Sequence, residues 1–143
     1  MVFPLKEIAD ERGAILHIMR SDSPWFSSFG EVYCSLTLPG AVKAWKLHRQ
    51  QTQHFAVPMG RLRVVLFDAR PHSTTKNVVQ QYVLGRPDRY MLLRIPPGLW
   101  YGFQALGNQT ALIVNLTDTP HDPEESERLT SSNGPIEFDW DST

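Results

Sequence analysis

An all-β fold, built as a sandwich or barrel of short strands, is what this sequence predicts. Its 143 residues include 11 prolines and 9 glycines, which leave little room for long helices. Short runs rich in Val, Ile, Leu, Tyr and Phe recur roughly every 8 to 12 residues, with turn signals between them. No apolar stripe with helical spacing persists over about 12 residues. The length suits one domain, which we expect to span residues 1–143.

Nine strands are expected from these runs, and a polar arm follows them. The expected strands are 14–19, 31–38, 42–47, 54–59, 61–67, 78–84, 90–95, 100–105 and 111–116. One helical turn is expected at 123–128, because Pro and acidic residues favour a first helical turn. Residues 117–143 are polar and acidic, which is typical of an arm that wraps the barrel or is partly disordered. Within that arm, Ile136, Phe138 and Trp140 alternate and could form a last edge strand.

Charge and cysteine content exclude some classes of partner and site. Lys plus Arg number 14 and Asp plus Glu 15, so no basic excess points to nucleic acid or an anionic membrane. Cys34 is the single cysteine and lies in an apolar run, which favours a buried inert thiol over a nucleophile. The first residues lack the pattern of a signal peptide, and no apolar stretch reaches the roughly 20 residues that span a bilayer. A cytoplasmic location is expected.

Strand parity in the segment 61–70 draws attention to Asp68. Side chains alternate between the two faces of a strand, so Asp68 continues the apolar face of Leu62, Val64 and Leu66. Two interpretations stay open at this point. Asp68 is either a strand-end acid that starts a turn or an acid at the mouth of a cavity.

Two further segments carry groups suited to chemistry. Residues 46–54 hold two His and three Gln, and His48 and Gln50 share strand parity. A His and an amide in a cavity could bind a sugar, polarise a carbonyl or transfer a proton; the alternative is a solvated edge or loop. Residues 95–103 form a Pro-Gly turn followed by aromatics. Trp100 and Tyr101 could stack on a sugar or base ring, or they are ordinary core aromatics.

Together the two segments resemble the two motifs of the cupins. The residues in the motif positions are His48, Gln50, Gln53 and Gly60, then Pro96, Gly98 and Tyr101. A metal-binding cupin needs about three His and a carboxylate as ligands. These positions offer one His and no carboxylate, so we expect no metal, and no other cofactor is implied.

Among cupins, the chain from about residue 10 to 140 resembles the nucleotide-sugar epimerases of the dTDP-4-dehydrorhamnose 3,5-epimerase type. The matching segments are 10–13, 46–50, 60–75 and 95–103, and the last is the most specific. The resemblance implies a cupin double-stranded β-helix, a jelly-roll barrel, with a polar C-terminal arm. It also implies a homodimer in which an N-terminal strand crosses to the partner.

The resemblance implies roles for particular residues. His48 would be the general base, Asp68 its possible orienting carboxylate, and Tyr101 a substitute general acid. Further substrate contacts would come from Gln50, His54 or Arg63 at the enolate, from Arg12 and Arg70 at the diphosphate, and from Trp100 by stacking.

Departures from the family pattern leave three functions open. The family's acid Tyr falls at Val114, beside Asn115, and the acid that pairs with the base His comes from a segment of longer members that this chain lacks. The first function is a metal-independent epimerase or keto-isomerase acting on a dTDP-4-keto-6-deoxyhexose, in polysaccharide or lipopolysaccharide precursor synthesis. The second is a non-catalytic cupin that binds a sugar nucleotide or sugar. A metal-dependent oxygenase is disfavoured by the ligand count.

Overall fold

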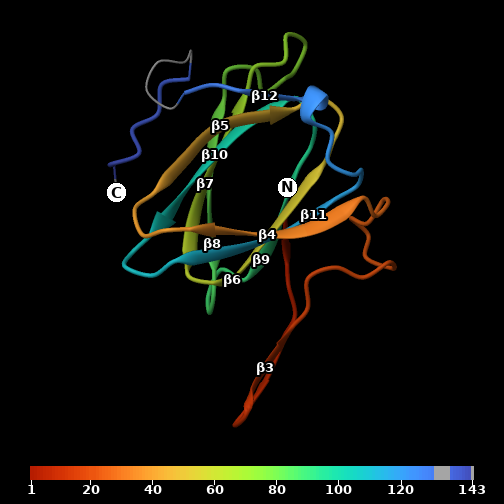
Figure 1. Cartoon of the computed structure of the whole chain (residues 1–143), viewed down its shortest axis with the longest axis vertical. Coiled ribbons are helices and arrows are strands. Elements are labelled where there is room, and N and C mark those ends of the chain that lie inside the picture. Colours follow the sequence, from red (N-terminus) through yellow and green to blue (C-terminus); the bar gives the residue numbers. More distant parts are fainter. Residues whose placement is uncertain (131–135, 143) are drawn as a thin grey trace.

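Two five-stranded sheets face each other and form the body of the molecule (Figure 1). The computed structural model describes residues 1–130 and 136–142. The first sheet contains, in spatial order, β1 (Val2–Pro4), β9 (Met91–Ile95), β6 (Gln53–Met59), β11 (Ala111–Thr117) and β4 (Glu31–Thr37). The second contains β12 (Ser126–Arg128), β5 (Val42–His48), β10 (Leu99–Leu106), β7 (Arg61–Asp68) and β8 (Val79–Gly85). Neighbouring strands within each sheet run antiparallel.

A separate hairpin of β2 (Glu7–Asp10) and β3 (Gly13–Leu16) extends away from this body (Figure 1). The nine predicted strands are confirmed, with ends that differ by a few residues. Strands β1, β2 and β12, which have three or four residues each, were not predicted from the sequence. So short a strand has little room for an alternating pattern, and the middle of β12 is the charged Glu127.

The C-terminal arm covers the outer face of the second sheet. The helical turn expected at 123–128 is confirmed only as a 3₁₀ turn at Pro123–Glu125, because Ser126–Arg128 form strand β12. The predicted edge strand at Ile136, Phe138 and Trp140 is wrong, because these residues form no strand. Instead they pack as side chains against Trp45 in a cluster outside the barrel. Residues 131–135 and 143 of the expected arm lie outside the described residues.

The core lies between the two sheets and follows from alternation along the strands. Inward side chains of β6, β7, β9, β10 and β11 form one continuous apolar cluster. On β7, Leu62, Val64 and Leu66 belong to this cluster, whereas Val65 joins the outer cluster with Trp45. Each side of β10 is therefore buried, the inner side by the barrel and the outer side by the arm.

Glycine is required at the turn between β6 and β7. Gly60 has a φ of +72°, a region that L side chains rarely adopt. A Cβ at this position would lie 2.6 Å from the carbonyl oxygen of Thr110. The Gly that the sequence places at the end of the first cupin motif is thus needed both for the turn and for close backbone packing.

Strand β4 lies at the edge of the first sheet and corrects the prediction for Cys34. The thiol is exposed rather than buried, because no side chain of the described residues covers this face of β4. The apolar run around Cys34 gave no sign of this, since an uncovered apolar face looks like a core strand in sequence.

None of the helices in the described part of the chain has the length and apolar character that crossing a bilayer requires.

Candidate active site

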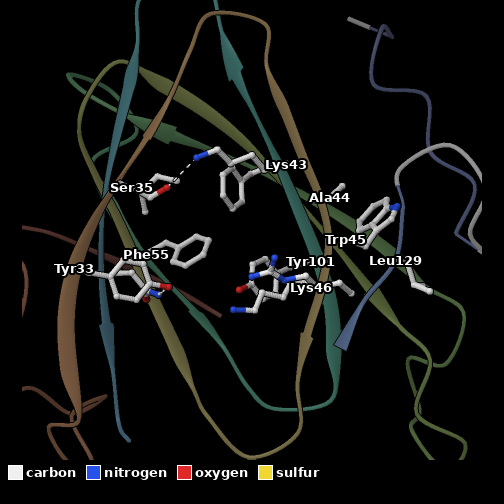
Figure 2. A pocket seen from close by; sticks show the side chains of 13 residues that line it. Tyr33, Ser35, Lys43, Ala44, Trp45, Lys46, Phe55, Tyr101 and Leu129 are labelled. Carbon is white, nitrogen blue, oxygen red and sulfur yellow. Dashed lines mark hydrogen bonds between the residues drawn. The ribbon is translucent and has the colours of Figure 1, made fainter. Parts of the chain in front are cut away.

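A cavity of about 370 Å³ opens between the free edges of the two sheets (Figure 2). Residues of β4, β5, β6, β10, β11 and β12 line it, together with one residue just past β12. The lining residues are Tyr33, Ser35, Lys43, Ala44, Trp45, Lys46, Phe55, Tyr101, Phe103, Ile113, Asn115, Arg128 and Leu129. These described residues include three cations, Lys43, Lys46 and Arg128, and no carboxylate. The cavity therefore favours an anionic ligand.

The cluster of Glu125, His48 and Tyr101 lies in the wall formed by the second sheet. His48 ends β5 and is 3% exposed. Its Nδ1 is hydrogen-bonded to a carboxylate oxygen of Glu125, and its Nε2 lies 3.2 Å from the Tyr101 hydroxyl. Tyr101 lines the cavity, so the chain of hydrogen bonds runs from a buried carboxylate to a hydroxyl on the cavity surface.

Glu125 reaches this position from the 3₁₀ turn that precedes β12. Its second oxygen accepts hydrogen bonds from the backbone amides of Gln50 and Gln51, at 3.1 and 3.3 Å. Burial alone would raise the pKa of Glu125, but the hydrogen bonds from His48 and these two amides outweigh it and lower the pKa below its ordinary value. The carboxylate is ionised at neutral pH and must accept from its partners.

The protonation state of His48 follows from these neighbours. Burial lowers its pKa below the ordinary value, and the hydrogen bond to Glu125 opposes this only in part. At neutral pH the imidazole is uncharged, with its proton on Nδ1, because the Glu125 carboxylate can only accept. The lone pair of Nε2 then faces the Tyr101 hydroxyl, which donates to it. This is the arrangement of a general base whose tautomer is fixed by a carboxylate at its other ring nitrogen.

Three cations line the same cavity as this cluster. Lys46 precedes His48 by two residues on β5, and both side chains therefore point to the same face. Arg128 follows on the neighbouring strand β12 and pairs in register with Lys46. Lys43 reaches across the opening to β4, where its ammonium donates to the Ser35 hydroxyl at 3.2 Å and the Leu36 carbonyl at 2.7 Å (Figure 2).

Asp68 is not the partner of His48, and this prediction is corrected. Its carboxylate accepts from the Arg70 side chain at 2.8 and 2.9 Å and from the Ser73 and Thr75 hydroxyls at 2.6 and 2.7 Å. Of the two interpretations that parity left open, the structure shows the strand-end acid that starts a turn. Arg70 is held by the same carboxylate and lines no part of the cavity described above.

Four other predicted contacts also lie elsewhere, for reasons of strand geometry. Trp100 neighbours the inward Tyr101 and so faces outward into the cluster of the arm. Arg63 also faces outward, where it donates to backbone carbonyls of the arm. His54 points away from the cavity and is bonded to the Leu116 carbonyl, while Gln50 is an exposed residue just past β5.

Arg12 sits at the tip of the projecting hairpin, exposed and paired with Asp10 at 2.7 Å. Within one chain it lies outside the cavity, and its predicted contact with a nucleotide stays a prediction.

Several residues of the site were missed by the sequence analysis. Lys46 could have been found, because it shares parity with His48. Glu125, Arg128 and Tyr33 lie far from His48 in sequence and carry no motif of their own. Within residues 1–130 and 136–142, no group of three or more His, Cys, Asp or Glu side chains is arranged to hold a metal ion.

Two antiparallel sheets that enclose a cavity, with a carboxylate-backed histidine in one wall, define a cupin-type jelly-roll protein with acid–base groups in its barrel. The model of the dTDP-4-dehydrorhamnose 3,5-epimerase family matches residues 1–143, and the chain belongs to this family of sugar-nucleotide epimerases.

Relatives with described functions agree with this placement. The "probable low-salt glycan biosynthesis epimerase Agl13" of Haloferax volcanii is 34% identical in an alignment of 136 residues that covers 92% of this chain and 86% of the relative. The "spore coat polysaccharide biosynthesis protein SpsL" of Bacillus subtilis is 32% identical in an alignment of 138 residues that covers 95% of this chain and 91% of the relative. The crystal structure of a dTDP sugar isomerase from Desulfovibrio desulfuricans G20 superposes with a TM-score of 0.96 at 51% identity, covering 98% of this chain and 89% of that one.

Proposed function

We propose that this protein epimerises or isomerises a dTDP-4-keto-6-deoxyhexose for polysaccharide or lipopolysaccharide precursor synthesis, with His48 as the proton acceptor and no metal ion. The observation that carries the proposal is the Glu125–His48–Tyr101 chain, which ends on a cavity lined by three cations. Relatives named for epimerase or isomerase activity and for glycan or polysaccharide biosynthesis support the substrate class.

Proton removal begins at the carbon next to the keto group. The C–H bond breaks, and its electron pair stays on the sugar as an enolate. The Tyr101 oxygen takes the proton while Tyr101 passes its own proton to Nε2 of His48, along the hydrogen bond already present. Burial raises the pKa of Tyr101, so its hydroxyl is protonated between turnovers. Tyr101 therefore acts as a proton relay and is not a permanent tyrosinate. This revises the prediction that Tyr101 is the acid.

Lys46 and Arg128 provide the positive charge that the reaction needs. Developing negative charge on the keto oxygen is stabilised by cations held in a site with little water. Burial removes part of the hydration of the Lys46 ammonium before substrate arrives, and this burial, together with the neighbouring Arg128, lowers the pKa of Lys46. The same cations attract the diphosphate, a role that the sequence analysis assigned to Arg12 and Arg70.

We propose that the protein is a homodimer. Strand β4 exposes an outward apolar stripe of Val32 and Leu36 beside Cys34, and β4 is an edge strand of its sheet. In such a dimer, the projecting hairpin would contact the partner, and Arg12 would approach a nucleotide bound there.

Solvent deuterium exchange tests the activity. In D₂O, dTDP-4-keto-6-deoxyglucose should gain deuterium at C3 or C5 in the presence of the wild-type protein, as read by proton NMR. His48→Ala should slow this exchange at least 100-fold, since a positioned general base contributes about 10²–10⁴-fold. His72→Ala, which alters an exposed turn residue, is the control and should exchange at the wild-type rate.

Binding of the nucleotide sugar without exchange would instead show a non-catalytic sugar-nucleotide binder. Exchange that requires added metal and stops with chelator would contradict the metal-free mechanism.

A further inference from the structure

Tyr33 holds a position that the steps described so far do not use. It lies on β4, in the first sheet, and its side chain lines the cavity from the wall opposite Tyr101 (Figure 2). Its neighbours on the strand, Val32 and Cys34, point outward, as alternation requires. The cavity therefore has a tyrosine hydroxyl on each of its two facing walls.

Asn115 fixes the direction of the Tyr33 hydroxyl. The two residues are register partners on β11 and β4, and the Asn115 amide nitrogen donates to the Tyr33 oxygen at 2.8 Å. The amide cannot be turned around, because its oxygen accepts from the backbone N–H of His54 at 3.1 Å. The same amide nitrogen also donates to the Gln53 side-chain oxygen at 2.6 Å. Buried neighbours therefore hold Asn115 as a donor towards Tyr33.

The consequence concerns the proton of Tyr33. Since its oxygen accepts from Asn115, the hydroxyl proton points elsewhere, and no acceptor for it occurs among the described residues. Burial raises the pKa of Tyr33 above its ordinary value despite the Asn115 hydrogen bond, so the proton is present at neutral pH. An oriented, protonated hydroxyl on the cavity surface is a donor ready for a ligand.

Inversion at a carbon requires a proton to leave from one face and another to arrive at the opposite face. Tyr101 cannot deliver the second proton, because it lies in the same wall as His48 and is bonded to it. We propose that Tyr33 is the general acid of this enzyme, delivering a proton to the face of the sugar opposite the Tyr101–His48 relay. This inference rests on the proposed function.

The proton balance closes in one turnover. The enolate electron pair forms a C–H bond with the Tyr33 proton, and the tyrosinate left behind is stabilised by the Asn115 N–H. Tyr33 is 39% exposed, so water reaches it to restore its proton. His48 loses to solvent the proton that it gained. No oxidant, reductant or metal is needed for the step.

Tyr33→Phe separates exchange from inversion. Without the acid, the enolate is reprotonated from the side of the base, which in D₂O returns deuterium with the original configuration. With dTDP-4-keto-6-deoxyglucose as the probe, we expect deuterium incorporation within about threefold of wild type and formation of the inverted sugar lowered at least 100-fold. Both rates are read in one NMR experiment. Tyr82→Phe is the control, because its hydroxyl bonds to Gln80 outside the cavity, and both of its rates should match wild type.

Three results would decide against Tyr33. Inversion at the wild-type rate in Tyr33→Phe would overturn the proposal. Equal loss of exchange and inversion in the folded variant, checked by circular dichroism, would also overturn it, since it would indicate a positioning role. Normal exchange with lost inversion in Tyr101→Phe would make Tyr101 the acid instead. A wild-type protein with no exchange at all would overturn the proposed function itself, which is a separate outcome.

Discussion

The tautomer of His48 is fixed by Glu125, which lies 77 positions away in the chain. A neutral imidazole has two tautomers, and only the one protonated on Nδ1 leaves the Nε2 lone pair available on the cavity side. The Glu125 carboxylate selects this tautomer, and two backbone amides prevent the carboxylate from turning. The base depends on Glu125 for orientation and for part of its basicity.

Glu125→Gln tests this dependence. Glu125 raises the pKa of His48 against the larger effect of burial, so its neutral replacement should lower that pKa further. A lower pKa means that His48 becomes protonated only at lower pH. The acid limb of the pH profile of exchange therefore shifts to lower pH, and the weaker base lowers the maximum rate about 10- to 100-fold. Glu124→Gln, exposed and adjacent, is the control and should leave the profile in place. An unchanged profile in Glu125→Gln would contradict the role of this carboxylate.

Alternation along a strand can be predicted from one sequence, whereas the pairing of one strand with another cannot. His48 and Tyr101 come together because β5 and β10 are long, regular and neighbours in one sheet. The same alternation rules out Trp100 as a cavity residue beside Tyr101, since adjacent residues on a strand face opposite ways. By contrast, the contact of Asn115 with Tyr33 depends on the pairing of β11 with β4 across 82 residues. A single sequence does not display that pairing.

Asp68 also shows the limit of parity. Alternation correctly placed it on the inner face at the end of β7, but its hydrogen-bond partners come from the loop that follows. This loop leads to β8, and its first residues donate hydrogen bonds to the Asp68 carboxylate. We conclude that Asp68 serves the connection between two strands rather than the reaction.

Asp68→Asn should therefore lower stability and spare exchange. Hydrogen bonds from Arg70 hold the pKa of Asp68 well below its ordinary value, so its contribution to stability is present above the ordinary Asp pKa of about 3.9 and is lost as pH falls towards the folded pKa. At pH 7 the variant should lose about 2 kcal/mol of unfolding free energy, measured by urea titration, and the loss should shrink in acid. Asp88→Asn, a more exposed residue, is the control. Loss of exchange at unchanged stability would contradict this structural role and indicate that Asp68 acts in the reaction.

The whole molecule presents two unlike regions to its surroundings. The cavity between the sheets is cationic, whereas the outer face of β4 beside it is apolar, with Leu36 62% exposed. Exposed apolar side chains in a row on an unpaired edge strand favour association with another chain. A second copy with the same stripe satisfies this edge by two-fold symmetry, which is the commonest arrangement of soluble oligomers.

Leu36→Arg tests whether that stripe is the dimer interface. In a two-fold interface each substitution appears twice, so two buried charges would replace two apolar contacts, and the variant should be monomeric at micromolar concentration while the wild type is dimeric. Light scattering after size exclusion gives the mass of each. Val79→Arg changes an exposed apolar residue on β8, which lies in the other sheet, and this variant should stay dimeric. A monomeric wild type, or a Leu36→Arg variant that remains dimeric, would contradict the proposal. Because Leu36 faces away from the cavity, any loss of substrate affinity in the monomer would then be assigned to the missing partner, whose Arg12 is the predicted nucleotide contact.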